Sequence, residues 1–112
     1  MDEYDTLDSG DREQWESGMK RDVTEGKTLW HLVSSGPMLK RWAELMTRGA
    51  VKYGEDNWLH ADSEEEYDRF RSSAYRHFMQ WYYGLNPEED HAAGVIFNLD
   101  GAEYVRERLN NE

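Results

Sequence analysis

The sequence predicts an all-α fold: a small bundle of three to four helices, oligomeric, with an acidic and partly disordered N-terminal tail. Apolar residues repeat at helical spacing in three separate segments, and Pro, Ser and Gly signals mark where those segments begin and end. The chain has 112 residues, enough for one small core. A bundle of this size commonly gains burial by pairing with a copy of itself, so we expect a homo-oligomer.

The first helix is predicted to begin at Pro37, because Pro at the first helical position loses no hydrogen bond that the helix would make. Gly49 and Gly54 weaken its continuation, so it should end near Val51 or Tyr53. The residues of its apolar face are Leu39, Trp42, Ala43 and Met46.

The second helix has the clearest boundary signals. Ser63 and Glu66 form a capping box, and Gly84 followed by Pro87 stops the helix. Its apolar stripe consists of Tyr67, Phe70, Ala74, Phe78 and Trp81. Pro87 can also open a third helix. The apolar positions of that helix are Ala92, Val95, Ile96, Leu99, Ala102 and Val105.

The charge balance excludes several classes of partner. With 24 acidic and 13 basic residues, the net charge is −11, so direct binding to a DNA or RNA backbone or to an anionic membrane is not expected. There is no cysteine, which excludes thiolate metal sites. No apolar run reaches membrane-spanning length, so we expect a cytoplasmic protein. Residues 1–16 are predicted to form a flexible acidic tail, and residues 17–112 a single helical domain.

Carboxylates near helix ends are the first candidates for chemistry. No residue sits in a known nucleophile motif and no Gly-rich phosphate loop is present, so covalent and P-loop chemistry have no support. Carboxylates on facing helices hold hard cations such as Mg²⁺ or Mn²⁺, because oxygen ligands suit these ions. The candidates for such a group are Glu44, Glu88, Glu89, Asp90 and His91. Alternatively, acidic residues in the first turn of a helix simply stabilise its dipole.

Basic and aromatic side chains are candidates for contacts with phosphates and a base. The basic candidates stand beside Gly or aromatic residues; the alternative is that they are solvated charges. They are Arg21, Lys27, Lys52 and Arg76. Tyr53 and Trp58 could stack on a base or belong to the core. Asn57 could contact a base or sugar, or serve only in a turn.

Four segments, taken in order, resemble one known family. They are SGMKRDVTEGK (17–27), RWAELMTRGAVKYGEDNW (41–58), SSAYRHFMQW (72–81) and EEDHAAGVIFNLDGAEYV (88–105). The chain resembles phage-type dATP/dGTP diphosphohydrolases, which are allied to the all-α MazG-like nucleotide pyrophosphohydrolases. The resemblance implies Mg²⁺-dependent hydrolysis of a purine deoxynucleoside triphosphate to the monophosphate and pyrophosphate. It also implies a role in phage nucleotide-pool metabolism, in the host cytoplasm.

The resemblance also implies roles for individual residues. It implies catalysis by Glu44, His77 and His91, and binding of Mg²⁺, or alternatively Mn²⁺, by Glu44, Glu88, Glu89 and Asp90. It implies substrate contacts for Arg21, Lys27, Lys52, Tyr53, Asn57, Trp58, Arg76 and Asn98. Bound cations would neutralise the triphosphate and stabilise charge on the leaving pyrophosphate, so an acidic surface is no obstacle to this chemistry.

Two positions depart from the family pattern. Relatives usually place Glu directly after the Gly that ends the second helix, where this chain has Leu85. Arg41 stands where a carboxylate partner of Glu44 would be expected. The metal site is then either rebuilt from residues 88–90 or lost. Two alternatives to the enzyme therefore stay open: a module that binds nucleotide without turnover, and an acidic interaction protein whose charge imitates nucleic acid.

Overall fold

The computed structural model describes residues 12–14, 18, 20–22 and 26–111. The chain divides into two compact units, residues 1–32 and 33–112, which are described separately below. Most of the expected tail, residues 1–16, lies outside the described residues.

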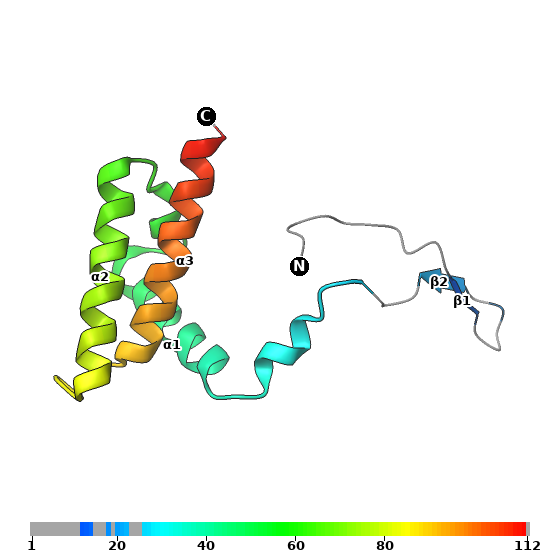
Figure 1. The fold of residues 1–112 in the computed structure, drawn as a ribbon, viewed down its shortest axis with the longest axis horizontal. Helices are drawn as coiled ribbons and strands as arrows, with labels where there is room; N and C mark the ends of the chain where they lie inside the picture. Colours follow the sequence, from blue (N-terminus) through cyan, green and yellow to red (C-terminus); the bar gives the residue numbers. More distant parts are fainter. Residues whose placement is uncertain (1–11, 15–17, 19, 23–25, 112) are drawn as a thin grey trace. The chain divides into compact units, whose positions relative to one another are not determined.

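The first unit contains a two-stranded antiparallel ribbon, which the sequence did not lead us to expect. The strands are β1 (Arg12–Gln14) and β2 (Lys20–Asp22), and Glu13 pairs with Arg21 (Figure 1). The α-helices that the structure describes all belong to the second unit. That unit confirms the predicted all-α fold class.

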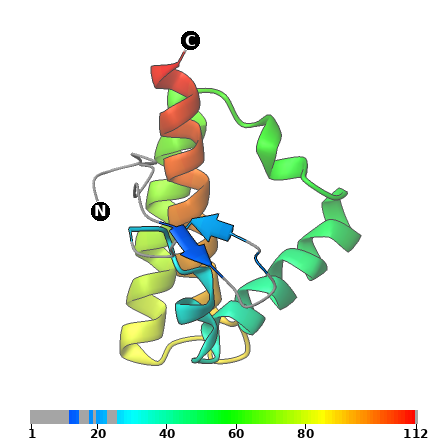
Figure 2. The same cartoon turned by 90° about the vertical axis from the view of Figure 1, so that its right-hand side faces the viewer.

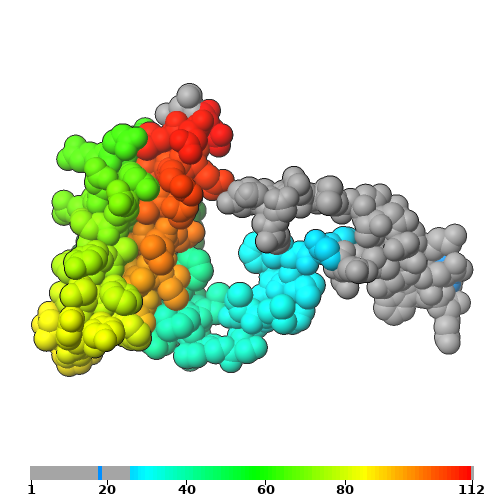
Figure 3. All heavy atoms as spheres, in the orientation of Figure 1, coloured from blue at the N-terminus to red at the C-terminus, as the bar shows by residue number. Residues whose placement is uncertain are grey.

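Three α-helices make up the second unit: α1 (Met38–Tyr53), α2 (Glu64–Tyr83) and α3 (His91–Asn110). Two short 3₁₀ turns, η1 (Trp30–Ser34) and η2 (Asn57–His60), precede α1 and α2. The space-filling view shows α2 and α3 packed side by side, and α1 packs more sparsely against α3 (Figure 3). No helix within the described ranges is long and apolar enough to cross a membrane.

The boundaries of α1 and α2 follow the predicted signals. Pro37 directly precedes α1, and the helix ends before Gly54, whose φ of 94° is unfavourable for other residues. The capping box of α2 is present: the Ser63 hydroxyl accepts from the Glu66 backbone N–H at 3.1 Å. The same hydroxyl donates to the Glu66 carboxylate at 2.8 Å.

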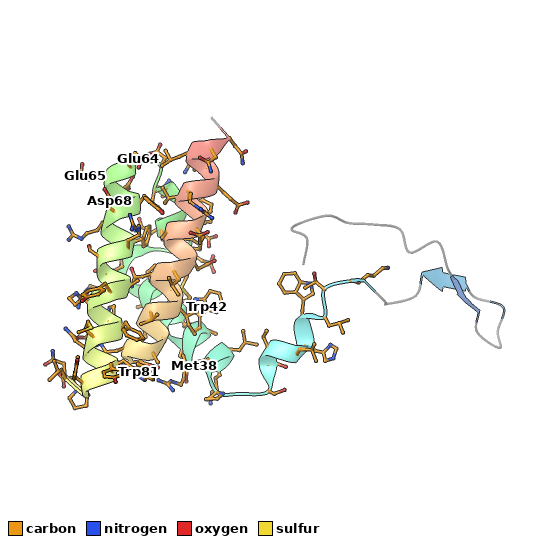
Figure 4. All side chains as sticks on the ribbon, viewed as in Figure 1. Met38, Trp42, Glu64, Glu65, Asp68 and Trp81 are labelled. Carbon is orange, nitrogen blue, oxygen red and sulfur yellow. The ribbon has the colours of Figure 1, made fainter. Side chains whose placement is uncertain are left out.

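Acidic residues gather where α2 begins. Glu64 and Glu65 occupy its first turn, with Asp68 one turn further, while Trp81 lies at the opposite end (Figure 4). Negative side chains at a helix N-terminus interact favourably with the helix dipole. This acidic cluster therefore has a sufficient structural explanation.

Helix α3 begins later than Pro87, so the predicted start was wrong. Residues 86–89 form a separate turn, in which the Glu89 N–H donates to the Asn86 carbonyl at 3.2 Å, and Asp90, with φ of −84° and ψ of 83°, lies outside the helical region. The helix begins at His91, and the Asp90 carboxylate caps it by accepting from the Ala93 backbone N–H at 3.1 Å.

Two glycines of α3 accommodate two rings of α2. A Cβ atom on Gly94 would lie 2.8 Å from Cγ of His77, and one on Gly101 would lie 2.5 Å from Cε1 of Phe70. The two glycines are seven residues apart on α3, and the two rings are seven residues apart on α2. Seven residues are about two helical turns, so both contacts lie along one face of each helix. The rings therefore occupy the space that side chains at these two α3 positions would need.

The buried face of α3 coincides only in part with the predicted apolar stripe, of which Ala102 and Val105 are buried. Its buried residues are His91, Ala93, Gly94, Asn98, Gly101, Ala102 and Val105. Leu99, which was predicted to be in the core, is 55% exposed, and so is Trp81; Phe78 is 45% exposed. The α2–α3 interface contains small α3 residues that pack against aromatic rings of α2. Hydrophobicity alone does not select such small residues, and it predicted a face of α3 that includes the exposed Leu99.

Candidate functional site

A broad groove runs between α1 and the α2–α3 pair. Figure 2 shows α1 running away from that pair, and the segment after it returning to the start of α2. Residues of α1, η2, one face of α2, the 88–90 turn and α3 line the groove, whose volume is about 1630 Å³. Small-molecule pockets typically have volumes of about 300–1,000 Å³, so a small ligand would fill only part of it.

The η2 turn is fixed to α3 and forms one wall of the groove. The Trp58 ring packs edge-on against Phe97 and Tyr104, with centroid distances of 5.9 and 5.2 Å. The Tyr104 hydroxyl donates to the Leu59 carbonyl at 2.7 Å, and Arg108 Nη1 donates to the same carbonyl at 2.9 Å. Trp58 is thus half-buried within a packed wall that borders the groove.

A histidine pair lies where α2 meets the start of α3. The Nδ1 atoms of His77 and His91 are 2.9 Å apart, and His91 is buried. The Nε2 atom of His91 lies 2.8 Å from the Asn86 carbonyl oxygen. A carbonyl only accepts, so the His91 Nε2 must carry a proton and donate it. In neutral His91, Nδ1 therefore carries a lone pair that points at His77.

Glu89 joins this pair. One donor atom from each of His77, Glu89 and His91 lies within 4.8 Å of the other two. Within the described part of the chain, no other group of three or more His, Asp or Glu side chains meets the same condition. Burial lowers the pKa of His77, the charges of Arg76 and His91 lower it further, and the charge of Glu89 raises it. Burial thus favours the neutral form of His77, in which one ring nitrogen carries a lone pair.

Asp90 is held by Arg41 through both carboxylate oxygens. Arg41 donates from Nε to Oδ2 at 2.8 Å and from Nη2 to Oδ1 at 2.5 Å. This pair, with the capping bond from Ala93, lowers the pKa of Asp90 to about 2. Arg41 stands where a carboxylate was expected, and it also binds Asp90, which was itself predicted to be a cation ligand.

The groove brings together most of the predicted site residues. Those that line it are Lys52, Tyr53, Asn57, Trp58, His77, Glu88, Glu89, Asp90 and Asn98. His91 contacts the groove-lining His77, whereas Glu44 and Arg76 do not line the groove. Arg21 and Lys27 belong to the first unit, and the Arg21 side chain lies outside the described part.

Two basic residues that sequence reasoning did not select also line the groove: Arg48 on α1 and Arg69 on α2. Arg48 precedes Lys52 by four residues, and Arg69 precedes His77 by eight, so each shares a helix face with a predicted site residue. That spacing was the available signal. The groove therefore carries cations on α1 and α2, and carboxylates on α2, in the segment between α1 and η2, and in the turn before α3.

Comparison with known families gives one match. A family model described as dATP/dGTP diphosphohydrolase, N-terminal, matches residues 16–104. Comparison with curated proteins and with solved structures gave no match. The matched segment contains all the groove-lining residues, the histidine pair and the Arg41–Asp90 pair.

Proposed function

The chain belongs to the dATP/dGTP diphosphohydrolase family, and we propose that it hydrolyses a purine deoxynucleoside triphosphate to the monophosphate and pyrophosphate. The observation that supports this proposal is the groove, because it collects most of the residues that the family resemblance implies for substrate and cation. We place the reaction in phage nucleotide-pool metabolism, in the host cytoplasm.

The cationic walls of the groove suit the triphosphate. Arg48 and Lys52 on α1 and Arg69 on α2 all line it. Arginine and lysine bind phosphate oxygens through charge-assisted hydrogen bonds. Six carboxylates also line the groove: Glu55, Asp56, Glu66, Glu88, Glu89 and Asp90. A bound divalent cation would therefore have to offset their charge when the triphosphate enters.

The nucleoside would lie along α1, η2 and α3. Tyr53 is 62% exposed at the groove and can stack on a base. The buried Asn98 donates from Nδ2 to the Gly94 carbonyl at 2.8 Å, and its Oδ1 is left to accept from a purine amino group. Asn57, at the start of η2, is positioned for a sugar or base contact.

The 88–90 turn and His77 form the acidic end of the groove. Asp90 is engaged by Arg41 and Glu44 lies outside the groove, so Glu88 and Glu89 are the predicted cation ligands that remain there for Mg²⁺. A bound divalent cation would supply charge neutralisation and polarise water. A cation role for Glu44 rests on the resemblance alone.

Exposed apolar side chains support the proposal that the protein is a homo-oligomer. The largest run lies at the end of α2 and in the turn after it: Phe78, Trp81, Tyr82, Tyr83 and Leu85, each 45% exposed or more. Contiguous apolar surface of this kind typically marks a protein contact. Sedimentation equilibrium would test the association.

The enzyme proposal is tested by incubating the protein with each of the four dNTPs and Mg²⁺ or Mn²⁺, followed by chromatographic separation of the products. We expect monophosphate and pyrophosphate in equal amounts, formed fastest from dATP or dGTP. Release of orthophosphate instead would indicate cleavage of a different bond. Absence of pyrophosphate with all four substrates would refute the enzymatic function.

The Arg41–Asp90 pair favours a second candidate function, a module that binds nucleotide without turnover. A carboxylate bound to a guanidinium through both oxygens is less available to a cation. Such a module would show an increase in Tm on addition of dATP or dGTP, with no product formed.

A further inference from the structure

We propose that His77, Glu89 and His91 form a binding site for a first-row transition-metal ion such as Zn²⁺ or Co²⁺. The ligands are two imidazole nitrogens and one carboxylate oxygen, so this site differs from the carboxylate Mg²⁺ site that the family resemblance implies. It does not require that the chain turn over nucleotide.

The distance between the two imidazoles suits a shared ion. Nitrogen ligands lie about 2.1 Å from Zn²⁺, so two of them are about 3.4 Å apart at the tetrahedral angle and about 3.0 Å apart at right angles. The Nδ1 atoms of His77 and His91 are 2.9 Å apart. Without an ion, one proton must lie between them, because two lone pairs or two protons at this distance would repel. An ion bound to both nitrogens would lie beside the line that joins them, so binding displaces that proton and requires a small rotation of the rings.

The hydrogen bond from His91 to Asn86 supplies the support that a metal-binding histidine needs. Metal-ligating histidines usually donate their second ring N–H to a carboxylate or a backbone carbonyl, which fixes the tautomer and the ring orientation. His91 does this through Nε2, at 2.8 Å from the Asn86 carbonyl. Its Nδ1 is therefore presented as a ligand before any ion arrives.

Packing holds the His77 ring against α3. Its Cγ atom lies where a Cβ on Gly94 would be only 2.8 Å away, so glycine at that position lets the ring approach His91. Glu89 is exposed, and both it and His77 line the groove. Solvent ions can thus reach the site from the groove, while His91 forms its buried side.

The donor set predicts which ions bind. Imidazole nitrogen suits Zn²⁺, Co²⁺ and other transition ions, whereas Mg²⁺ prefers oxygen ligands and keeps several waters. Three protein ligands also leave coordination positions open for water or for a phosphate oxygen. The site would therefore discriminate against Mg²⁺ and could still contact a ligand in the groove.

The test is a Co²⁺ titration of the untagged full chain, without nucleotide, followed by visible absorption. We expect absorption bands that saturate at one Co²⁺ per chain and that Zn²⁺ abolishes, whereas millimolar Mg²⁺ leaves them unchanged. In a ¹⁵N spectrum of the histidine rings, Zn²⁺ should shift Nδ1 of His77 and His91 and leave His31 and His60 unchanged.

Two variants provide a matched comparison. Glu89→Gln removes one ligand at an exposed position, so the fold should persist, and we expect Co²⁺ affinity to fall at least tenfold. Glu107→Gln makes the same chemical change at an exposed position on α3, outside the groove and the donor group, and should leave the affinity unchanged. Equal affinities for wild type and Glu89→Gln would overturn the site. Equal losses in the two variants, or no Co²⁺ bands in wild type, would do the same.

Discussion

Replacing Gly101 by Ala tests the close contact between α2 and α3. The added Cβ would lie 2.5 Å from Cε1 and 2.6 Å from Cδ1 of Phe70, whereas carbon atoms normally approach to about 3.5–4.0 Å. The Phe70 ring cannot move freely, because it packs edge-on against Phe97 with centroids 5.8 Å apart. Overpacking of this kind costs about 1–3 kcal/mol, and Ala returns about 1 kcal/mol through helix propensity. We expect a net destabilisation of up to about 2 kcal/mol.

Gly49→Ala is the matched control, because it makes the same substitution within α1, where no atom lies within 4 Å of the new Cβ. That variant should gain about 0.5–1 kcal/mol from helix propensity alone. Thermal unfolding followed by circular dichroism separates the two, since 1 kcal/mol shifts the Tm of a domain this small by about 4–8 °C. A Tm for Gly101→Ala at or above that of wild type would refute the described packing.

Three further predictions concern charges. Because Arg41 lowers the pKa of Asp90 to about 2, from an ordinary value of 3.8, the pair stabilises the fold above pH 4 and loses this effect as the pH falls toward 2. Urea titrations give the free energy of unfolding of wild type and of Asp90→Asn. The difference between them should shrink from about 1–2 kcal/mol at pH 6 toward zero at pH 2. A difference that stays constant with pH would contradict this prediction. Lys52→Ala should raise KM for dNTP about tenfold or more. Lys40 is exposed on α1 and lies outside the groove, so Lys40→Ala should leave KM unchanged. Equal KM values for the two variants would exclude Lys52 from phosphate binding. The family resemblance predicts that Glu44→Ala abolishes cation-dependent turnover without changing helix content. Because Glu44 lies outside the groove, unchanged turnover would leave the cation to Glu88 and Glu89.

The sequence predicted the elements of the helical unit well, because their signals are local. The capping box at Ser63 and the Pro–Gly boundaries of α1 depend on neighbouring residues only, and each lies where it was expected. The start of α3 was mispredicted because Pro87 lies in a separate turn, and Asp90, with φ of −84° and ψ of 83°, leaves the helical region and caps the helix that begins at His91.

The core was harder to predict, because contacts between helices decide it. Hydrophobic periodicity selected Leu99, yet the structure buries Gly94 and Gly101, which carry no hydrophobic signal. Their role becomes visible only when the rings of His77 and Phe70 are placed against them.

For the candidate site too, some residues could be selected from the sequence, but the contacts between them could not. The family resemblance selected His77 and His91 as separate catalytic residues, but nothing in the sequence shows that their Nδ1 atoms lie 2.9 Å apart. Nor does it show that Arg41 binds Asp90, which lies 49 residues further along the chain. Both contacts depend on the turn between α2 and α3 and on the packing of α1, which no local pattern encodes.

The measurement that tests the proposed function most directly is a crystal structure of the protein with a divalent cation and a non-hydrolysable dATP or dGTP analogue. We expect the nucleotide in the groove between α1 and the α2–α3 pair, with its phosphates near Lys52 and its base near Tyr53 and Asn98. A nucleotide bound outside the groove, or no nucleotide at saturating concentration, would contradict the assignment of this groove as the active site.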